Sequence, residues 1–262
     1  MIAAVSDAVR DAAIVARLAG ARRIVELPHA RQRTEGVVGV VWRAGAAIAI
    51  CAYRCELTAL PGAIGELAQL ARLDVGDNRL TELPALPASL RELYVHDNQL
   101  ARLPGLPRLS VLDANRNRLD ELPALDGIAF VYLAANRLAA LPATSGVRYL
   151  NVGDNPLVHL ALADPAIQEL RAEQAQLRTL AIDRLTGLRE LSLRGNQLAV
   201  LPPSIGSLGQ LGVLDLRGNQ LDDLPETLRA LPLTKLDLRW NPLRARPAWL
   251  DELTHRGCLV YL

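Results

Sequence analysis

Leucines and other apolar residues recur along most of the chain with one fixed spacing. From Leu188 to Pro202 the sequence reads L-x-x-L-x-L-x-x-N-x-L-x-x-L-P, and the same order returns from Leu211 to Pro225. Similar segments follow one another from about residue 47 to residue 247. Repetition at a nearly constant period is the signature of stacked structural units, so the pattern predicts a repeat solenoid.

The asparagine of the pattern marks each unit. Successive positions are separated by steps of 23, 20, 19, 19, 19, 20, 21, 23 and 22 residues, which predicts ten units in one register. These positions are Cys55, Asn78, Asn98, Asn117, Asn136, Asn155, Ala175, Asn196, Asn219 and Asn241.

The leucine spacing has a physical reason. In L-x-x-L-x-L the last two leucines lie two residues apart, which is the period of a strand, so both face one side while the residue between them faces the other. One such strand cannot bury its apolar side alone, but stacked neighbours pair their backbones and form a continuous core. We therefore expect one short strand in each unit and a parallel sheet.

The motif resembles the leucine-rich-repeat family over roughly three quarters of the chain. Central units, such as residues 83–104, look like the short bacterial repeats of secreted effector proteins, including the effector ubiquitin ligases. Outer units with Ile64-Gly65 or Ile205-Gly206 look like the longer repeats of many intracellular proteins. The resemblance implies an α/β repeat solenoid, a leucine-rich-repeat horseshoe with its parallel sheet on the concave side.

The polar positions predict the remainder of each unit. The Asn side chain can bond backbone groups of adjacent coils, so it needs no functional explanation, and the family also accepts Cys there. Ala175 predicts a weakened turn and a weak joint at residues 161–176. Proline after leucine ends each segment because it blocks helix continuation. The short units leave room only for extended or 3₁₀ segments on the convex side, with short helices in the units of 21 to 23 residues.

The first 46 residues predict an N-terminal cap. A helix is expected at about residues 3–20, with Ser6 or Asp7 as its cap and Gly20 as its end, followed by a linker and a strand. Charged residues interrupt this stretch, which excludes a secretory signal. The expected apolar side of the helix consists of Val5, Val9, Ala12 and Ala16, with Ile14 and Leu18 on the charged side.

Between this helix and the first repeat the chain is less regular. The arginine-rich tract from Arg22 to Arg33 is either an anionic docking patch or a solvated loop, and the lack of interleaved aromatic residues favours the loop. Residues 37–42 predict a further strand, either separate or a degenerate unit. Cys51 is expected on the open face and Cys55 inward, about 13 Å apart at 3.3 Å per residue, too far to form a disulfide.

The last residues predict a second cap. Residues 47–247 hold the ten repeats, and residues 248–262 hold a short helix that includes Trp249 and Leu253, followed by a strand from Cys258 to Leu262. We expect one structural domain, with no second domain after it. The few cysteines favour a reducing compartment, so we expect a cytoplasmic protein, with delivery into a host cell as an option.

Composition excludes some functions. With 29 basic and 28 acidic residues, no global field attracts nucleic acid or a membrane surface, and we expect a monomer without membrane insertion. The chain holds no phosphate-binding glycine loop, no nucleophile elbow and no zinc-ligand spacing. We therefore expect no enzyme activity, no cofactor and no metal site.

The variable strand positions are the candidate binding residues. Four of the five tyrosines and the only phenylalanine fall on them, and exposed aromatics rimmed by charge are typical of interface hot spots; alternatively they stack across strands for stability. An arginine ladder near the C-terminus could grip an acidic partner, although pairing with adjacent carboxylates is favoured. The candidates are Tyr94, His96, Asp113, Arg116, Phe130, Tyr132, Tyr149, Arg171, Arg194, Arg217 and Arg239.

Three functions remain open. The first is a non-enzymatic recognition module that binds a protein or peptide on the concave face. The second is a secreted bacterial effector, or the substrate-recognition part of an effector ubiquitin ligase that lacks the catalytic domain. The third is a scaffold that contributes stability alone.

Overall fold

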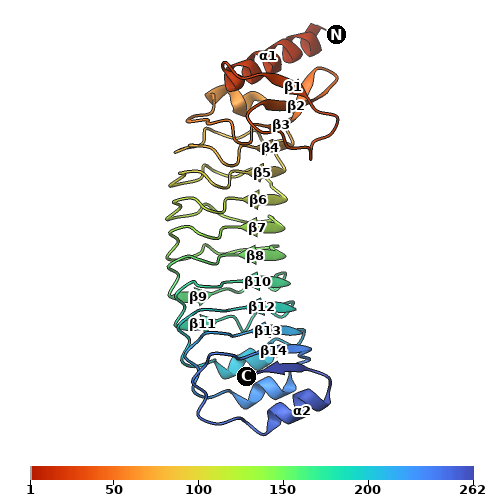
Figure 1. Ribbon diagram of the computed structural model, residues 1–262. Helices are drawn as coiled ribbons and strands as arrows, with labels where there is room; N and C mark the ends of the chain where they lie inside the picture. The colour runs from red at the N-terminus through yellow and green to blue at the C-terminus, as the bar shows by residue number, and fades with distance from the viewer. Residues whose placement is uncertain (1) are drawn as a thin grey trace. The chain divides into compact units, whose positions relative to one another are not determined.

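The computed structural model describes residues 2–262, which divide into two compact units after Ile128. Both are stretches of leucine-rich-repeat solenoid, with one short strand in each repeat, as predicted (Figure 1). The predicted boundaries of caps and repeats, and the single domain, stay predictions.

The first unit builds one sheet in the order β1-β2-β3-β4-β5-β6. Every neighbouring pair is parallel except β2 and β3, which form an antiparallel hairpin. The expected strand at residues 37–42 is therefore present, but its interpretation as a degenerate repeat is wrong. The elements are α1 (Ile2–Ala19), β1 (Ile24–Glu26), β2 (Val38–Arg43), β3 (Ala46–Cys51), η1 (Gly62–Glu66), β4 (Arg72–Asp74), β5 (Glu92–Tyr94) and β6 (Val111–Asp113).

Helix α1 begins at Ile2, so Ser6 and Asp7 lie inside the helix and the predicted cap is wrong. The predicted apolar side is wrong as well: Val9 is 66% exposed, whereas Ile14 and Leu18 are buried. The side chain of Val5 lies outside the described residues. The buried face instead consists of Asp11, Ile14, Val15, Leu18 and Ala19, a helical spacing that includes a carboxylate. Asp11 accepts a hydrogen bond from the Ala47 amide at 3.1 Å and so ties the helix to β3.

The second unit carries a parallel sheet in the order β7-β8-β10-β12-β13-β14-β15. Its elements are β7 (Phe130–Tyr132), β8 (Tyr149–Asn151), β9 (His159–Ala161), β10 (Glu169–Arg171), β11 (Thr179–Ala181), β12 (Glu190–Ser192), η2 (Pro203–Ser207), β13 (Val213–Asp215), η3 (Glu226–Ala230), β14 (Lys235–Asp237), α2 (Trp249–His255) and β15 (Leu259–Tyr261). Helix α2 and β15 are the short helix and the strand that the sequence predicts after the repeats.

The asparagine ladder joins consecutive repeats within each unit. Asn155 donates to the carbonyl oxygens of Leu133, Val152 and Gly153 at 3.0 Å each, and its Oδ1 accepts from the Leu138 amide at 3.0 Å. Asn155 is 1% exposed, so these bonds satisfy an amide that water cannot reach. The residue before each ladder position has a positive φ, from 52° at Arg54 to 70° at Gly195.

The two repeats without asparagine solve the turn differently. A second residue with positive φ follows the ladder position in both, at Glu56 (50°) after Cys55 and at Gln176 (60°) after Ala175. The carbonyl of Ala175 accepts the Leu157 amide at 3.1 Å, where other repeats use the Asn oxygen. Strand β9, which follows Leu157, and strand β11, which follows Ala175, pair as an additional two-stranded parallel sheet. The backbone thus supplies bonds at the joint that the sequence predicts to be weak.

Helical turns away from the sheet follow the repeat length. The 3₁₀ helices η1, η2 and η3 fall only in the repeats of 22 and 23 residues, and the shorter repeats within residues 2–262 stay extended. Each helix follows a proline in the extended conformation (Pro61, Pro202 and Pro225), because the proline ends the preceding segment. The prediction of short helices is therefore confirmed for the repeats of 22 and 23 residues, whereas the repeat of 21 residues between Ala175 and Asn196 has none.

Candidate binding surface on the strands

Each three-residue strand of the repeats buries its central side chain and presents its two neighbours on the opposite side of the sheet, which we term the open face. Leu73, Leu93 and Leu112 are fully buried in the first unit, as are Val131 and Leu150 in the second. The residues on either side of them are the variable positions that the sequence singles out. The open face is described below for each unit.

In the first unit, Arg72 contacts both an aromatic ring and a carboxylate on the neighbouring strand β5. Its guanidinium lies 4.1 Å from the ring centroid of Tyr94 and is ion-paired with Glu92. The Tyr94 hydroxyl donates to Glu92 at 3.2 Å. Burial raises the pKa of Tyr94, although the neighbouring Arg72 opposes the shift. Tyr94 is therefore engaged within its own unit.

A residue of the N-terminal cap also reaches this face. Arg33 Nε donates to Asp74 Oδ2 at 2.8 Å, and its terminal nitrogen lies 3.2 Å from His96 Nε2. The guanidinium carbon stands 5.1 Å from the Tyr53 ring centroid and 5.9 Å from that of Tyr94. The solvated-loop interpretation is therefore wrong for Arg33, which sequence reasoning missed because the contact spans 41 residues.

His96 has a charged neighbour at each ring nitrogen. Its Nε2 lies 3.2 Å from a terminal nitrogen of Arg33, a group that can only donate. Its Nδ1 lies 2.9 Å from Asp97 Oδ2. His96 is thus a polar partner for Arg33 on this face.

Asp113 and Arg116 stand beside these residues. Burial raises the pKa of Asp113, against the opposing charges of His96 and Arg33. Its Oδ1 accepts the Asn115 amide at 3.2 Å. Arg116 is more exposed and is ion-paired with Asp97 at 3.5 Å, so this contact falls in the range of weak surface pairs.

The second unit presents its aromatic residues more openly. Phe130 is 41% exposed although it is wholly apolar, and it stands in register with Tyr149 on the next strand. The rings of Tyr132 and Tyr149 lie 4.8 Å apart at an angle of 36°. Burial raises the pKa of Tyr149, while Arg171 lowers it. The predicted aromatic residues Phe130, Tyr132 and Tyr149 therefore lie together, whereas Tyr94 belongs to the first unit.

Next along this face is a hollow of about 340 Å³ over β10, β12, β13 and β14. Ser192 and Val213, both short, lie among long charged side chains. Arg194 is exposed and makes no ion pair or side-chain hydrogen bond with the described residues. The charged lining residues are Glu169, Arg171, Glu173, Glu190, Arg194, Asp215, Arg217 and Lys235, so the hollow offers both signs of charge.

The arginine ladder is mostly paired. Arg217 binds Asp215 and lies 3.4 Å from Asp237, and Arg239 binds Asp237 at 2.7 Å. Asp237 is fully buried; burial alone would raise its pKa, but its bonds to Arg239 and the nearby charges hold the pKa below its usual range. Arg171 is paired with Glu169 at 2.6 Å. Of the four predicted arginines in this unit, Arg194 alone lacks an ion pair within the described chain.

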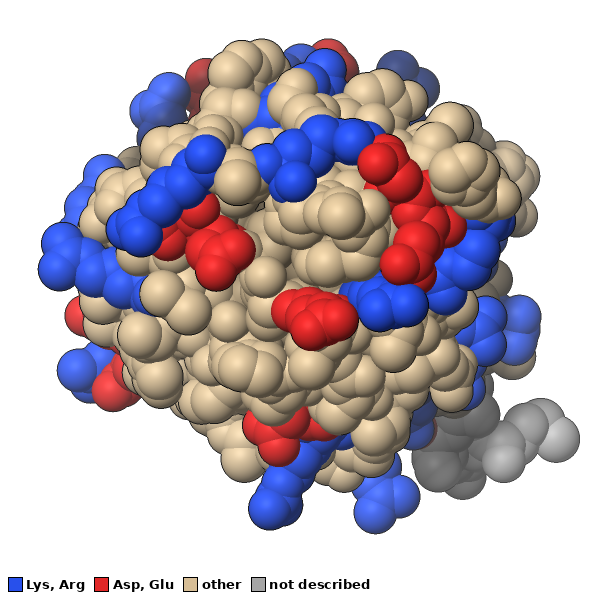
Figure 2. All heavy atoms as spheres, turned by 90° about the horizontal axis from the view of Figure 1, so that it is seen from below, with Lys and Arg blue, Asp and Glu red and all other residues tan. Residues whose placement is uncertain are grey.

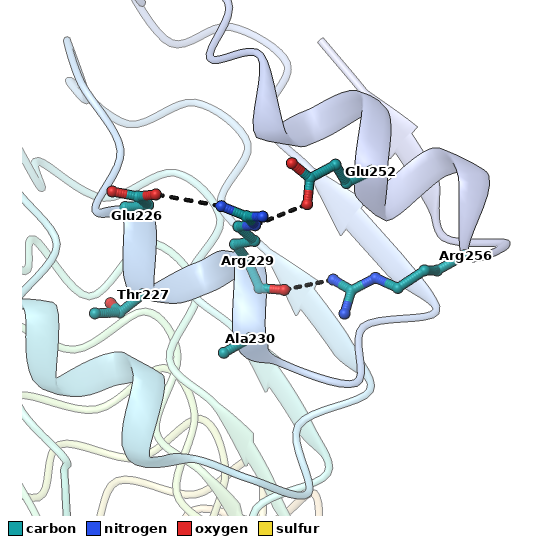
Figure 3. Close-up of a pocket in the computed structure, with 6 residues that line it drawn as sticks. All are labelled: Glu226, Thr227, Arg229, Ala230, Glu252 and Arg256. Atoms are coloured by element: carbon teal, nitrogen blue, oxygen red, sulfur yellow. Dashed lines mark hydrogen bonds and ion pairs between the residues drawn. The ribbon is translucent and has the colours of Figure 1, made fainter.

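Away from the strands, a cavity of about 550 Å³ lies between η3 and α2 (Figure 3). Arg229 stands between Glu226 and Glu252, at 3.5 and 2.7 Å, and Arg256 donates to the Arg229 carbonyl. These groups satisfy one another. Seen from the end that carries α2, basic and acidic side chains are interspersed and no single sign dominates (Figure 2).

The cysteines offer no reactive surface. All three are free and buried, and burial raises the pKa of Cys55 and Cys258. Cys51 stands in register with Asp74, at an open-face position, yet is 3% exposed. Within residues 2–262 there is no cluster of three potential metal ligands, and no helix is long and apolar enough to cross a membrane.

Comparisons with known proteins agree with this architecture. The family described as Leucine rich repeat matches residues 186–243. LIC12759, a leucine-rich-repeat protein of Leptospira interrogans, is 24% identical with a TM-score of 0.54 over 79% of this chain and 70% of its own. No curated protein matches the sequence.

Two structures of YopM are also similar. YopM of Yersinia enterocolitica WA-314 is 29% identical with a TM-score of 0.50, over 73% of this chain and 51% of its own. YopM of Yersinia pestis, described as a leucine-rich effector protein, is 24% identical with a TM-score of 0.55, over 92% of this chain and 65% of its own. This chain thus spans about half of the Y. enterocolitica protein.

Proposed function

The chain is a leucine-rich-repeat protein of bacterial type, and from this premise we propose that it is a non-enzymatic recognition module. Its fold supports a protein-interaction module. The partner is a protein or peptide that docks on the open face of the second unit. Phe130, Tyr132 and Tyr149 provide the apolar anchor, and the hollow beside them provides polar orientation.

The exposure of Phe130 carries this proposal. A wholly apolar ring at 41% exposure gains nothing from water, and burying it under a partner recovers a share of the roughly 1.5–3 kcal/mol that such a side chain yields on full burial. Tyr132 and Tyr149 add large rings with a polar tip, the composition typical of interface hot spots. Stacking across strands for stability explains the contact between the two tyrosine rings, but it does not explain why Phe130 is exposed.

The hollow favours a partner of mixed charge. Its carboxylates and cations are interspersed, and half of them are ion-paired with a neighbour: Arg171 with Glu169, and Arg217 with Asp215. The other four charged side chains are available to a partner's charges. Two cations that line the hollow, Arg194 and Lys235, have no ion pair among the described residues. Lys235 lies 6.0 Å from the Tyr261 ring, so Arg194 is the group most ready to receive a carboxylate.

The test is affinity capture from lysate with wild type and a Phe130→Ala/Tyr132→Ala variant. The matched control is Val200→Ala, which removes another exposed apolar side chain (68%) from a loop of the same unit. We expect the control to retain the wild-type partner and the double variant to lose it, with identical circular dichroism. Equal capture by all three proteins would show that the aromatic residues serve the fold alone.

A second candidate is an effector delivered into a host cell. The observation behind it is the similarity to YopM, described for Y. pestis as an effector protein. A reporter fused to residues 1–50 should then leave a bacterium with a competent secretion system. Retention of the reporter, with export of a known substrate as the control, would contradict this candidate.

A further inference from the structure

We propose that Tyr53, Asp74, Tyr94 and His96 form a binding cage for an arginine side chain, and that Arg33 of the same chain is its internal occupant. A partner's arginine replaces Arg33 when it binds. The cage lies in the first unit and stands independently of the aromatic patch in the second.

The cage contains each kind of group that recognises a guanidinium. Asp74 supplies a carboxylate at 2.8 Å, and His96 places a ring nitrogen at 3.2 Å. Two aromatic rings flank the cation, with centroids at 5.1 and 5.9 Å, inside the range of cation–π attraction. A lysine would fill this site less well, because its ammonium lacks the planar donor arrangement of guanidinium.

The cage belongs to the rigid frame of the repeats. Asp74 ends β4 and Tyr94 ends β5, while Tyr53 and His96 follow β3 and β5. The Asp74 carboxylate is 1% exposed, and its Oδ1 accepts the Gly76 amide at 3.2 Å. Arg72 lies 3.9 Å from Asp74 Oδ2 but is ion-paired with Glu92, so the departure of Arg33 removes a direct hydrogen bond from a buried carboxylate. Because the Gly76 amide keeps the carboxylate in position, the site is preformed for a second guanidinium.

The occupant comes from a loop that is lightly attached. No residue from 28 to 37 is buried, and the Arg33 side chain is itself 43% exposed, in contrast to its partner Asp74. Apart from the Arg33 contacts, this loop is held by few bonds, among them Gly36 to the Tyr53 carbonyl at 3.3 Å and Glu35 to Arg54 at 3.3 Å. Release of Arg33 exposes no apolar core, so it does not require unfolding of the cap.

An internal occupant makes the site selective. A group tethered by a short loop competes at an effective concentration in the millimolar range, which excludes free arginine and other weak cations. A partner that makes further contacts along the open face binds tightly enough to displace Arg33. Arg33 thus acts as an autoinhibitory contact on an arginine site.

The experiment removes the occupant. Arg33→Ala in the full chain is titrated with N-acetyl-arginine amide by calorimetry, beside wild type, with N-acetyl-citrulline amide as the neutral isostere. We expect the variant to bind the arginine amide about tenfold or more tightly than wild type, and to ignore citrulline. An Arg33→Ala/Asp74→Asn variant should lose the binding.

Each other outcome overturns the proposal. A folded Arg33→Ala protein that binds no arginine amide, or binds citrulline equally, would make Arg33 a structural latch. If the variant is unstable, the arginine amide must raise its melting temperature while leaving that of wild type unchanged. An unstable variant that the ligand does not rescue would likewise leave Arg33 with a structural role only.

Discussion

The two units use the same strand positions in different ways. In the first unit, Arg33 and Arg72 fill the open face with ion pairs and ring contacts. In the second unit, Phe130 and Arg194 stay exposed beside a hollow. Because the leucines and asparagines that build the frame are common to both, the variable strand residues and the cap loop that carries Arg33 decide whether a face is occupied by its own chain or remains open to a partner.

The largest expected effect tests whether the frame is equivalent in the two units. Asn98 in the first unit and Asn155 in the second each make four backbone bonds across neighbouring repeats. Alanine at either position should lower the free energy of unfolding by about 1–3 kcal/mol, because buried amide and carbonyl groups lose their partners. Urea denaturation measures both. If the losses in unfolding free energy of the two variants differed severalfold, the two units would differ in their asparagine ladders and not only in their open faces.

An intermediate effect concerns pH and has opposite signs in the two units. Burial raises the pKa of Asp113, although the charges of His96 and Arg33 partly oppose the shift and Asp74 adds to it. The stability that this shift contributes is present below the unfolded-state pKa and is lost as pH rises through the folded-state pKa. Asp113→Asn should therefore be more stable than wild type at neutral pH, and the gap should close in acid.

Asp237 should behave in the reverse way. Arg239 and Arg217 hold its pKa below the usual range despite burial, so its contribution is present above the unfolded-state pKa and lost as pH falls through the folded-state pKa. Asp237→Asn should be less stable than wild type at neutral pH and approach it in acid. Thermal melts of both variants from neutral to acid pH provide the measurement. Parallel trends for the two variants would contradict the assignment.

The smallest expected effect is that of the exposed ring on stability. Phe130→Ala should change the free energy of unfolding by no more than about 0.5 kcal/mol, because surface substitutions away from packed features are close to neutral. Val131→Ala, one residue away and fully buried, is the matched control and should cost far more. A large loss for Phe130→Ala in urea denaturation would mean that this face, too, is structural.

Sequence periodicity predicted the frame because the frame depends on local spacing. The strand in each repeat, the asparagine turns and the 3₁₀ helices of the longer repeats all follow from residues within one or two units. The buried face of α1 did not, since Asp11 is buried through a bond to Ala47 that hydropathy cannot reveal. The prediction of a weak joint at Ala175 was also incomplete, because the pairing of β9 with β11 depends on backbone geometry that the residue pattern does not show.

The candidate site was predicted only in part for the same reason. The strand positions identified Phe130, Tyr132 and Tyr149 as neighbours, and the pairing of Arg217 and Arg239 with adjacent aspartates follows from the repeat register. Arg33 belongs to an irregular loop without a repeat position, so no period relates it to Asp74. The one available signal was the density of arginine in the tract that precedes the repeats.

The most direct test of the comparison is arginine labelling with a dicarbonyl reagent, measured residue by residue by mass spectrometry. Such reagents need a free guanidinium. Arg33 is held by Asp74 and lies within 6 Å of the Tyr53 and Tyr94 ring centroids, whereas Arg194 is exposed without an ion pair in the described chain. We predict rapid modification of Arg194 and slow modification of Arg33. Equal rates, or faster modification of Arg33, would contradict the account of an occupied first face and an open second face.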